Sequence, residues 1–308
     1  MEGPKLQDTT IKIPEQSREG ARLTSVEKLR GVMARISSEV NEGVKGVYGL
    51  DGLVDESLHM NVKFFLRKHG GPYDKESISA DRKRVDKLDR DHSSADDLNV
   101  QKHFREHEGI ATPEGIVEKH LKTKEESKGN QAEMIITALL HKILKERFLV
   151  VRASTFDDYM HGVDNLIIDK ETGAVICAFD EVVENQGDKE KGASKKIDKV
   201  KKIAIEGGTE AKYGISLKEG VLTREYLRNI PVFYLTLESK DLIELTDDLY
   251  NNREGATKAE ERLFGHLVRS IKEQKEMLEK LNLPTVMKRK LGEFDSSLAV
   301  IEGFVAKQ

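Results

Sequence analysis

Three acidic side chains stand in otherwise apolar segments between residues 130 and 184 of this 308-residue chain. Glu133 lies in an apolar segment with helical spacing, Asp164 opens the run VDNLIID, and Asp180 ends the run GAVICAFD. An isolated carboxylate is costly to bury unless it is paired, hydrogen-bonded or coordinated to a metal. Because carboxylate oxygens are the ligands that hard divalent cations prefer, the three acids predict a site for Mg²⁺ or Mn²⁺.

Two of these acids also have a purely structural interpretation. Glu133 shares a helical face with Ile136 and Leu140, which directs it toward the core or a cleft at its edge. A glutamate near a helix N-terminus is, however, favoured by the helix dipole even when it is solvated. Asp164 follows Gly162 closely and could form only a turn hydrogen bond.

Asp180 is the most informative of the three. Its segment is apolar on both faces until the acid, as expected for a central strand that is covered on both sides. Strand alternation places Asp180 and Glu181 on opposite faces. We expect Asp180 to face a cleft and to converge there with Glu133 and Asp164.

A glutamate on a helix, an aspartate on a second strand and an acid on a third strand resemble the pattern of the PD-(D/E)XK nuclease superfamily. The resemblance covers residues 130–250 and implies an α/β fold: a restriction-endonuclease-like core with a mixed central sheet flanked by helices. It also implies metal-dependent phosphodiester hydrolysis of nucleic acid, with DNA favoured over RNA. In that family the two strand acids hold the metal, which implies Asp164 and Asp180 as ligands and Glu133 as the third acid.

The lysine that aligns or activates the attacking water in that family is missing from its usual position. Two residues after Asp180 the chain has Val182, and the register shifted to Glu181 gives Val183. Some members carry this lysine on the following helix, where Lys196 is best placed here to point inward. Two functions stay open: an active nuclease with Lys196 as its catalytic cation, or a catalytically inactive nuclease-like scaffold that binds nucleic acid or a protein partner.

Other candidate residues are weaker. Asp157 and Asp158 precede the second strand and could add ligands to the same cation or serve as turn residues. His161 could act as a local base or contact a phosphate, although a single loop histidine is more often solvated. His103 and His107 have helical spacing but no obvious third ligand, and the chain contains no Walker loop.

Composition excludes several other classes. The net charge of −4 is not that of a generally basic nucleic-acid binder, although it allows a local basic patch. Cys177 is the only cysteine, which excludes intramolecular disulfides and thiol-rich metal sites. The N-terminal sequence lacks a basic region followed by an apolar one, and no apolar run is long enough to span a membrane. We expect a cytoplasmic protein without membrane contact.

The pattern along the chain divides it at Gly129 and Asn130 and again near Thr257. We expect four parts: a mobile tail (1–20), a helical region (21–128), the α/β core (129–254) and a C-terminal helical region (255–308). In the core we expect helices at 131–146, at 193–205 and from Ser239 to Tyr250, and strands at 148–153, 162–169, 174–183 and 232–236.

The flanking regions are predicted from three-to-four apolar spacing. We expect helices from Ser25, over Val54–Arg67, from Thr112 and over 257–282. The apolar register of the last helix drifts at Gln274. This helix therefore packs either on the same body or in a two-helix interface, through which the chain would form a homodimer.

Overall fold

The computed structural model describes residues 23–184, 189–218 and 220–305. The tail expected at residues 1–20 lies outside these ranges. The helices and short 3₁₀ helices are α1 (Ser25–Tyr48), η1 (Val62–Phe65), η2 (Arg67–His69), α2 (Lys75–His92), α3 (Leu98–His107), α4 (Pro113–Glu126), α5 (Lys128–Leu144), α6 (Thr155–His161), α7 (Lys189–Ile205), α8 (Leu242–Asn251), α9 (Lys258–Glu279) and α10 (Thr285–Val305). The strands are β1 (Phe148–Arg152), β2 (Asn165–Asp169), β3 (Val175–Glu184), β4 (Thr209–Lys218), β5 (Val221–Ile230) and β6 (Val232–Glu238).

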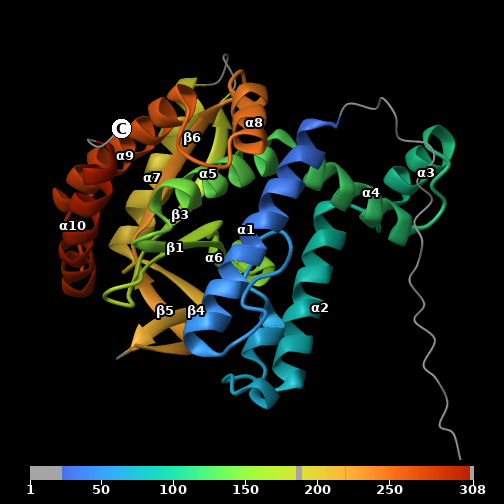
Figure 1. Ribbon diagram of the computed structural model, residues 1–308. Coiled ribbons are helices and arrows are strands. Elements are labelled where there is room, and N and C mark those ends of the chain that lie inside the picture. Colours follow the sequence, from blue (N-terminus) through green and yellow to red (C-terminus); the bar gives the residue numbers. More distant parts are fainter. Residues whose placement is uncertain (1–22, 185–188, 219, 306–308) are drawn as a thin grey trace, which may run out of the picture.

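A mixed four-stranded sheet in the order β1-β2-β3-β6 lies at the centre of the molecule (Figure 1). Strands β1, β2 and β3 are antiparallel neighbours, and β3 pairs in parallel with β6. The turn from β2 to β3 contains Gly173 at φ 69°, as expected for this connection. The prediction of an α/β protein with a mixed sheet flanked by helices is confirmed.

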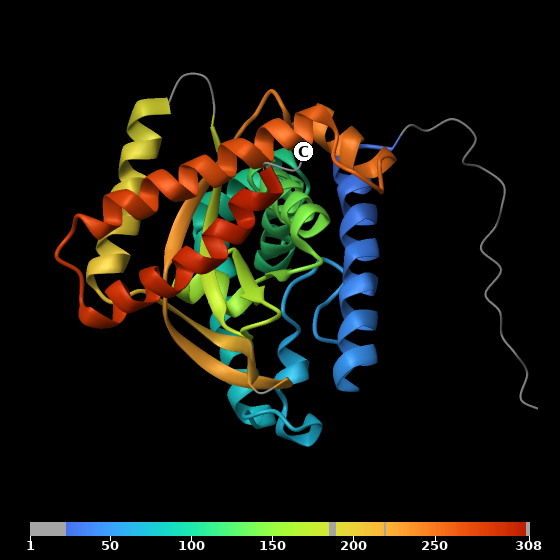
Figure 2. The same ribbon diagram turned by 60° about the vertical axis from the view of Figure 1, so that its left-hand side comes forward.

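Helices cover both faces of this sheet. Helix α5 packs on β1 and β3, and α10 lies on the same face, where Phe294 stacks on Phe233 of β6. Helix α7 packs against β6, and α9 runs along β6 and beside α10 (Figure 2). Of the two arrangements left open for the helix at 257–282, the structure shows packing on the same body.

One hydrophobic core joins the flanking helices to the sheet. It includes Leu29 of α1, Ile135 of α5, Cys177 of β3 and Phe264 of α9, all 0% exposed. Cys177, the single cysteine, is thus a buried core residue. The helical flanks therefore contribute directly to the core that positions the acids.

The prediction of a helix over Val54–Arg67 is wrong. This segment contains isolated bridges, such as the one between Val54 and Met60, the whole of η1 and the first residue of η2. The side chain of Asn41 bonds both the N–H and the carbonyl of Val54, and Leu58 has a φ of 66°. The apolar spacing here reflects burial of a loop against α1.

Three other local predictions are also wrong. Gly129 and Asn130 do not break the chain but lie inside α5, because Ser127 caps that helix through the N–H of Asn130. Helix α8 begins at Leu242, so Ser239 is not its cap. The loop expected around residues 157–158 is helix α6.

The sequence analysis also missed the hairpin β4–β5, which forms a separate two-stranded sheet. In contrast, Thr112 caps α4 with Pro113 in its first turn, as predicted. Between residues 23 and 128 the structure contains helices and single-residue bridges, and it contains no strand of several residues.

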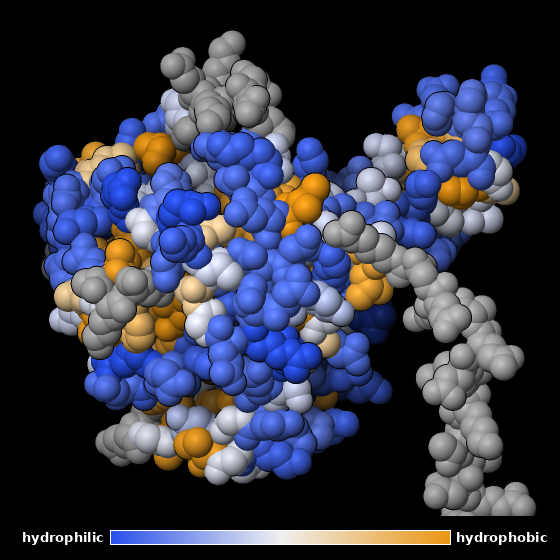
Figure 3. Space-filling model, turned by 45° about the horizontal axis from the view of Figure 1, so that its top comes forward, coloured by the Kyte–Doolittle hydropathy of each residue, from blue (hydrophilic) through white to orange (hydrophobic). Residues whose placement is uncertain are grey.

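Hydrophilic side chains cover most of the face shown in Figure 3, with hydrophobic ones in small separate areas. Helix α3 and the neighbouring end of α4 project from the body (Figure 1). Within the described ranges, no helix combines the length and the apolar character needed to cross a membrane.

Candidate active site

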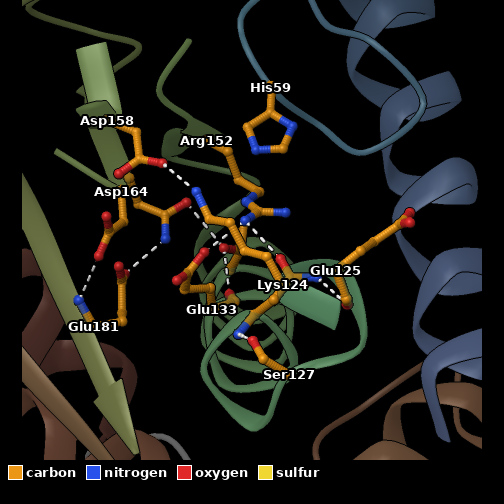
Figure 4. A network of polar contacts seen from close by, with 12 residues as sticks. His59, Lys124, Glu125, Ser127, Glu133, Arg152, Asp158, Asp164 and Glu181 are labelled. Carbon is orange, nitrogen blue, oxygen red and sulfur yellow. Dashed lines mark hydrogen bonds and ion pairs between the residues drawn. The ribbon is translucent and has the colours of Figure 1, made fainter. Parts of the chain in front are cut away.

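Glu133 is held by an arginine that enters from the sheet. Its Oε2 lies 2.6 Å from Nη2 of Arg152, the last residue of β1 (Figure 4). The same guanidinium donates to Oδ1 of Asn130 at 3.1 Å. Burial raises the pKa of the Glu133 carboxyl, although the charge of Arg152 opposes the shift.

Asp164 lies where β2 begins. Its Oδ2 accepts a hydrogen bond of 2.7 Å from the backbone N–H of Glu181 on β3. Burial, followed by the charge of Glu133, raises the pKa of Asp164 to about 7. This carboxyl can therefore exchange a proton near neutral pH.

Glu181 points to the face of the sheet that α5 covers. Its Oε1 accepts from Nδ2 of Asn165 at 2.6 Å, and Asn165 in turn accepts from the hydroxyl of Thr137 on α5 at 2.9 Å. Its other oxygen, Oε2, is buried without a hydrogen-bond partner. Burial and then the charge of Asp164 raise the pKa of Glu181 well above its usual range.

Asp180 is paired with lysines rather than with these acids, although its charge contributes to the raised pKa of Asp164. Its carboxylate faces α7, where Oδ1 lies 2.6 Å from Nζ of Lys196 and Oδ2 lies 2.7 Å from Nζ of Lys199. Lys196 thus points inward, as its helical position predicted, but to the opposite face. The acid on β3 that lies with Asp164 is Glu181.

The other sequence candidates have structural partners. Asp157 is buried and accepts from the backbone N–H groups of Lys212 and Tyr213, which ties α6 to β4. His161 lies 3.8 Å from Asp157. Asp158 stays near the acids, 3.8 Å from the ammonium group of Lys124.

His103 and His107 stack on each other with ring centroids 4.5 Å apart on α3, far along the chain from the acids. Nothing in the described ranges supplies a third ligand beside them.

A cleft of about 250 Å³ opens beside Glu133. Arg152, Asp158 and Lys124 of α4 line it (Figure 4), and α1 contributes a further cation, Arg30. Guanidinium and ammonium groups of this kind recognise phosphate oxygens. Each of these cations is paired with an acid of the same lining: Arg30 with Glu125, Lys124 with Asp158 and Arg152 with Glu133.

A divalent cation fits the donors that this site offers. Asp164 and Glu181 are adjacent carboxylates, and Glu181 has a buried oxygen without a partner. In the part of the chain that the structure describes, no three acids, histidines or cysteines are grouped closely enough to bind a metal as they stand. Mg²⁺ requires fewer, because it keeps several waters and binds through one or two carboxylates.

The sequence analysis missed two members of the site. Arg152 ends the buried strand LVVR, where an arginine needs an acidic partner, and this signal was available. Glu181 entered the sequence prediction only as the alternative to Asp180 in the motif, with Val183 at the lysine position. To choose between Asp180 and Glu181, one has to know which face of the sheet α5 covers.

Comparisons of the chain with known protein families, with curated proteins and with solved structures found no match.

Proposed function

We propose that the protein is a metal-dependent phosphodiesterase that cleaves nucleic acid, with DNA favoured over RNA, and that Asp164 and Glu181 are its metal-binding acids. The observation that carries this proposal is the contact between these two residues. Their pKa values are raised by burial and by neighbouring acids, so the ionised pair lacks a compensating charge. A bound Mg²⁺ or Mn²⁺ would supply that charge.

The arrangement of elements supports the resemblance to PD-(D/E)XK nucleases. The acids come from a helix (Glu133), from the start of the second strand (Asp164) and from the third strand (Glu181), which is the order in that superfamily. Here Glu181 takes the place first assigned to Asp180. A restriction-endonuclease-like core is accordingly part of the proposal.

The residues of this chain would divide the work as follows. Asp164 and Glu181 would hold a divalent cation, and such an ion, when bound, would supply polarisation of a phosphoryl oxygen and a lowered pKa of bound water. Asp164 would be an ionised ligand of that cation, and the raised pKa of its free carboxyl reflects the negative charge that the cation would compensate. Val183 occupies the position of the family's lysine and carries no charge. On this face Arg152 supplies a positive charge instead, which stabilises negative charge on the phosphate.

A second candidate is a catalytically inactive nuclease-like scaffold that binds nucleic acid or a protein partner. The specific observation in its favour is that Glu133 is already neutralised by Arg152, while Val183 leaves the lysine position apolar. Such a protein would keep the cleft with its arginine and lysine side chains and would not catalyse the reaction.

Cleavage of single- and double-stranded DNA and RNA with Mg²⁺ or Mn²⁺ tests both candidates. We expect the wild type to cleave, and Asp164→Asn and Glu181→Gln each to lose at least about 100-fold in rate. Lys196→Met, on the opposite face, is the matched control and keeps its activity. Binding without cleavage by the wild type would support the scaffold, and loss of activity in Lys196→Met alone would refute our assignment of the acids.

A further inference from the structure

A second cavity, of about 350 Å³, lies between α1, α5, the strands β1 and β2, and the hairpin β4–β5. None of Glu133, Asp164 and Glu181 lines it. Its walls are mainly apolar and come from Val44 of α1, Phe148 of β1, Ile168 of β2 and Leu222 of β5. Ligand pockets are commonly about 300–1,000 Å³ and apolar with a few polar groups, so this cavity suits a small molecule.

His141 is the first polar group that lines this cavity. It is 7% exposed, and neither ring nitrogen has a hydrogen-bond partner. The carboxylate of Glu39 lies just beyond good hydrogen-bond geometry, with Oε2 3.5 Å from Nε2, so Nδ1 is the ring nitrogen without any polar neighbour of this kind. Burial lowers the pKa of His141 to about 4, so the ring is neutral and offers one N–H donor and one acceptor. Buried polar groups without partners are rare in folded proteins.

Lys170, beside His141 in the cavity lining, is the second polar group. Its ammonium group donates to the backbone carbonyl of Lys145 but forms no ion pair within the described ranges. Burial of part of the side chain lowers its pKa, although the residue as a whole is exposed and the charge of Glu146 opposes the shift. Lys145 already has an acidic partner, Glu39, at 3.7 Å. Among the described residues that line the cavity, Lys170 is thus the cation without an ion pair at contact distance, although the charge of Glu146 in the same lining acts on it.

We propose that this cavity binds a small monocarboxylic acid with an apolar body, such as a medium-chain fatty acid or an aryl carboxylate. Its carboxylate accepts hydrogen bonds from Lys170 and from the N–H of His141. Its apolar body packs against Val44, Phe148 and Ile168. This inference is independent of the proposed nuclease activity, because it uses none of the acids or cations of that site.

Titration calorimetry of the full chain with octanoate tests the proposal, and octan-1-ol is the probe that lacks the charge. We expect octanoate to bind at least about tenfold more tightly than octan-1-ol. Lys170→Met should lose at least about tenfold in octanoate affinity, while Lys83→Met, an exposed lysine on α2, should bind as the wild type does. Val44→Trp fills the cavity and should abolish binding of both probes.

Circular dichroism of each variant separates loss of binding from loss of fold. The proposal is wrong if folded wild type shows no octanoate binding at millimolar concentration, or if folded Lys170→Met binds octanoate unchanged. Equal affinities for octanoate and octan-1-ol would equally rule out recognition of a carboxylate.

Discussion

The carboxylate of Asp164 accepts a hydrogen bond of 2.7 Å from the backbone N–H of Glu181. This bond continues the pairing of β3 beyond the first residue of β2 and holds two acids side by side. Proteins seldom keep two buried carboxylates together without a cation or a shared proton. The behaviour of this pair with pH and with divalent ions is therefore the most direct test of the site.

Protonation of Asp164 should couple the stability of the protein to pH. Its folded pKa of about 7 lies above the ordinary value of 3.8, so the native state binds the extra proton and stability falls as pH rises from about 4 to 7. At pH 8 the ionised group would cost up to about 4 kcal/mol. We expect Asp164→Asn to be more stable than the wild type at pH 8 and to differ little from it at pH 4, as measured by urea unfolding.

Glu76→Gln, at an exposed position on α2, is the control for this experiment and should follow the wild-type curve. If the free energy of unfolding of the wild type and of Asp164→Asn changed with pH in the same way, ionisation of Asp164 would carry no cost in stability, and the prediction would be wrong.

Divalent cations should stabilise the wild type, independently of any activity. A ligand that binds only the native state adds about 2.7 kcal/mol to the free energy of unfolding at 100 times its dissociation constant. We expect Mg²⁺ and Mn²⁺ to raise the melting temperature at pH 8, and Asp164→Asn and Glu181→Gln to remove this effect. If Asp180→Asn removes it and Glu181→Gln does not, the cation binds on the other face of the sheet.

Asp180 should be an anchor for α7. Its carboxylate is nearly buried and receives both Lys196 and Lys199, which lie on successive turns of that helix. Because the lysines are partly exposed, we expect Asp180→Asn to lower the free energy of unfolding by about 1–3 kcal/mol, and Lys196→Met or Lys199→Met by about 1 kcal/mol or less. Urea unfolding measures these differences, and Lys202→Met, an exposed lysine on α7, should have no effect.

The acids show how far the sequence alone could lead. Apolar runs interrupted by Glu133, Asp164 and Asp180 correctly located the region in which charge is buried. Alternation also placed Asp180 and Glu181 on opposite faces, but it could not tell which face α5 covers. That choice depends on contacts such as the one between Thr137 and Asn165, which only the folded chain brings together.

The missed elements have a similar cause. Strands β4 and β5 carry charged residues such as Lys212 and Arg224, so their alternation was hidden by polar side chains that find partners elsewhere in the fold. Val54–Arg67 gave the opposite error, because a buried loop can place apolar residues at helical spacing. In both cases tertiary contacts decided the local structure.

Gln274 gives a final prediction. Gln274 interrupts the apolar pattern of α9. It is 4% exposed, and its side-chain amide bonds the backbone of Tyr234 on β6. Its Oε1 accepts from the N–H of Tyr234 at 2.8 Å, and its Nε2 donates to the carbonyl at 2.7 Å. The amide thus replaces a neighbouring strand at the edge of the sheet.

Gln274→Leu should leave both backbone groups of Tyr234 buried and unsatisfied, at a cost of about 2–4 kcal/mol in the free energy of unfolding. Urea unfolding measures this loss, and hydrogen exchange should show faster exchange of the Tyr234 amide. Gln131→Leu is the matched control, because Gln131 bonds a backbone carbonyl at an exposed position and its loss should change stability by less than about 0.5 kcal/mol. Equal stability of Gln274→Leu and the control would mean that α9 covers this edge by apolar packing alone.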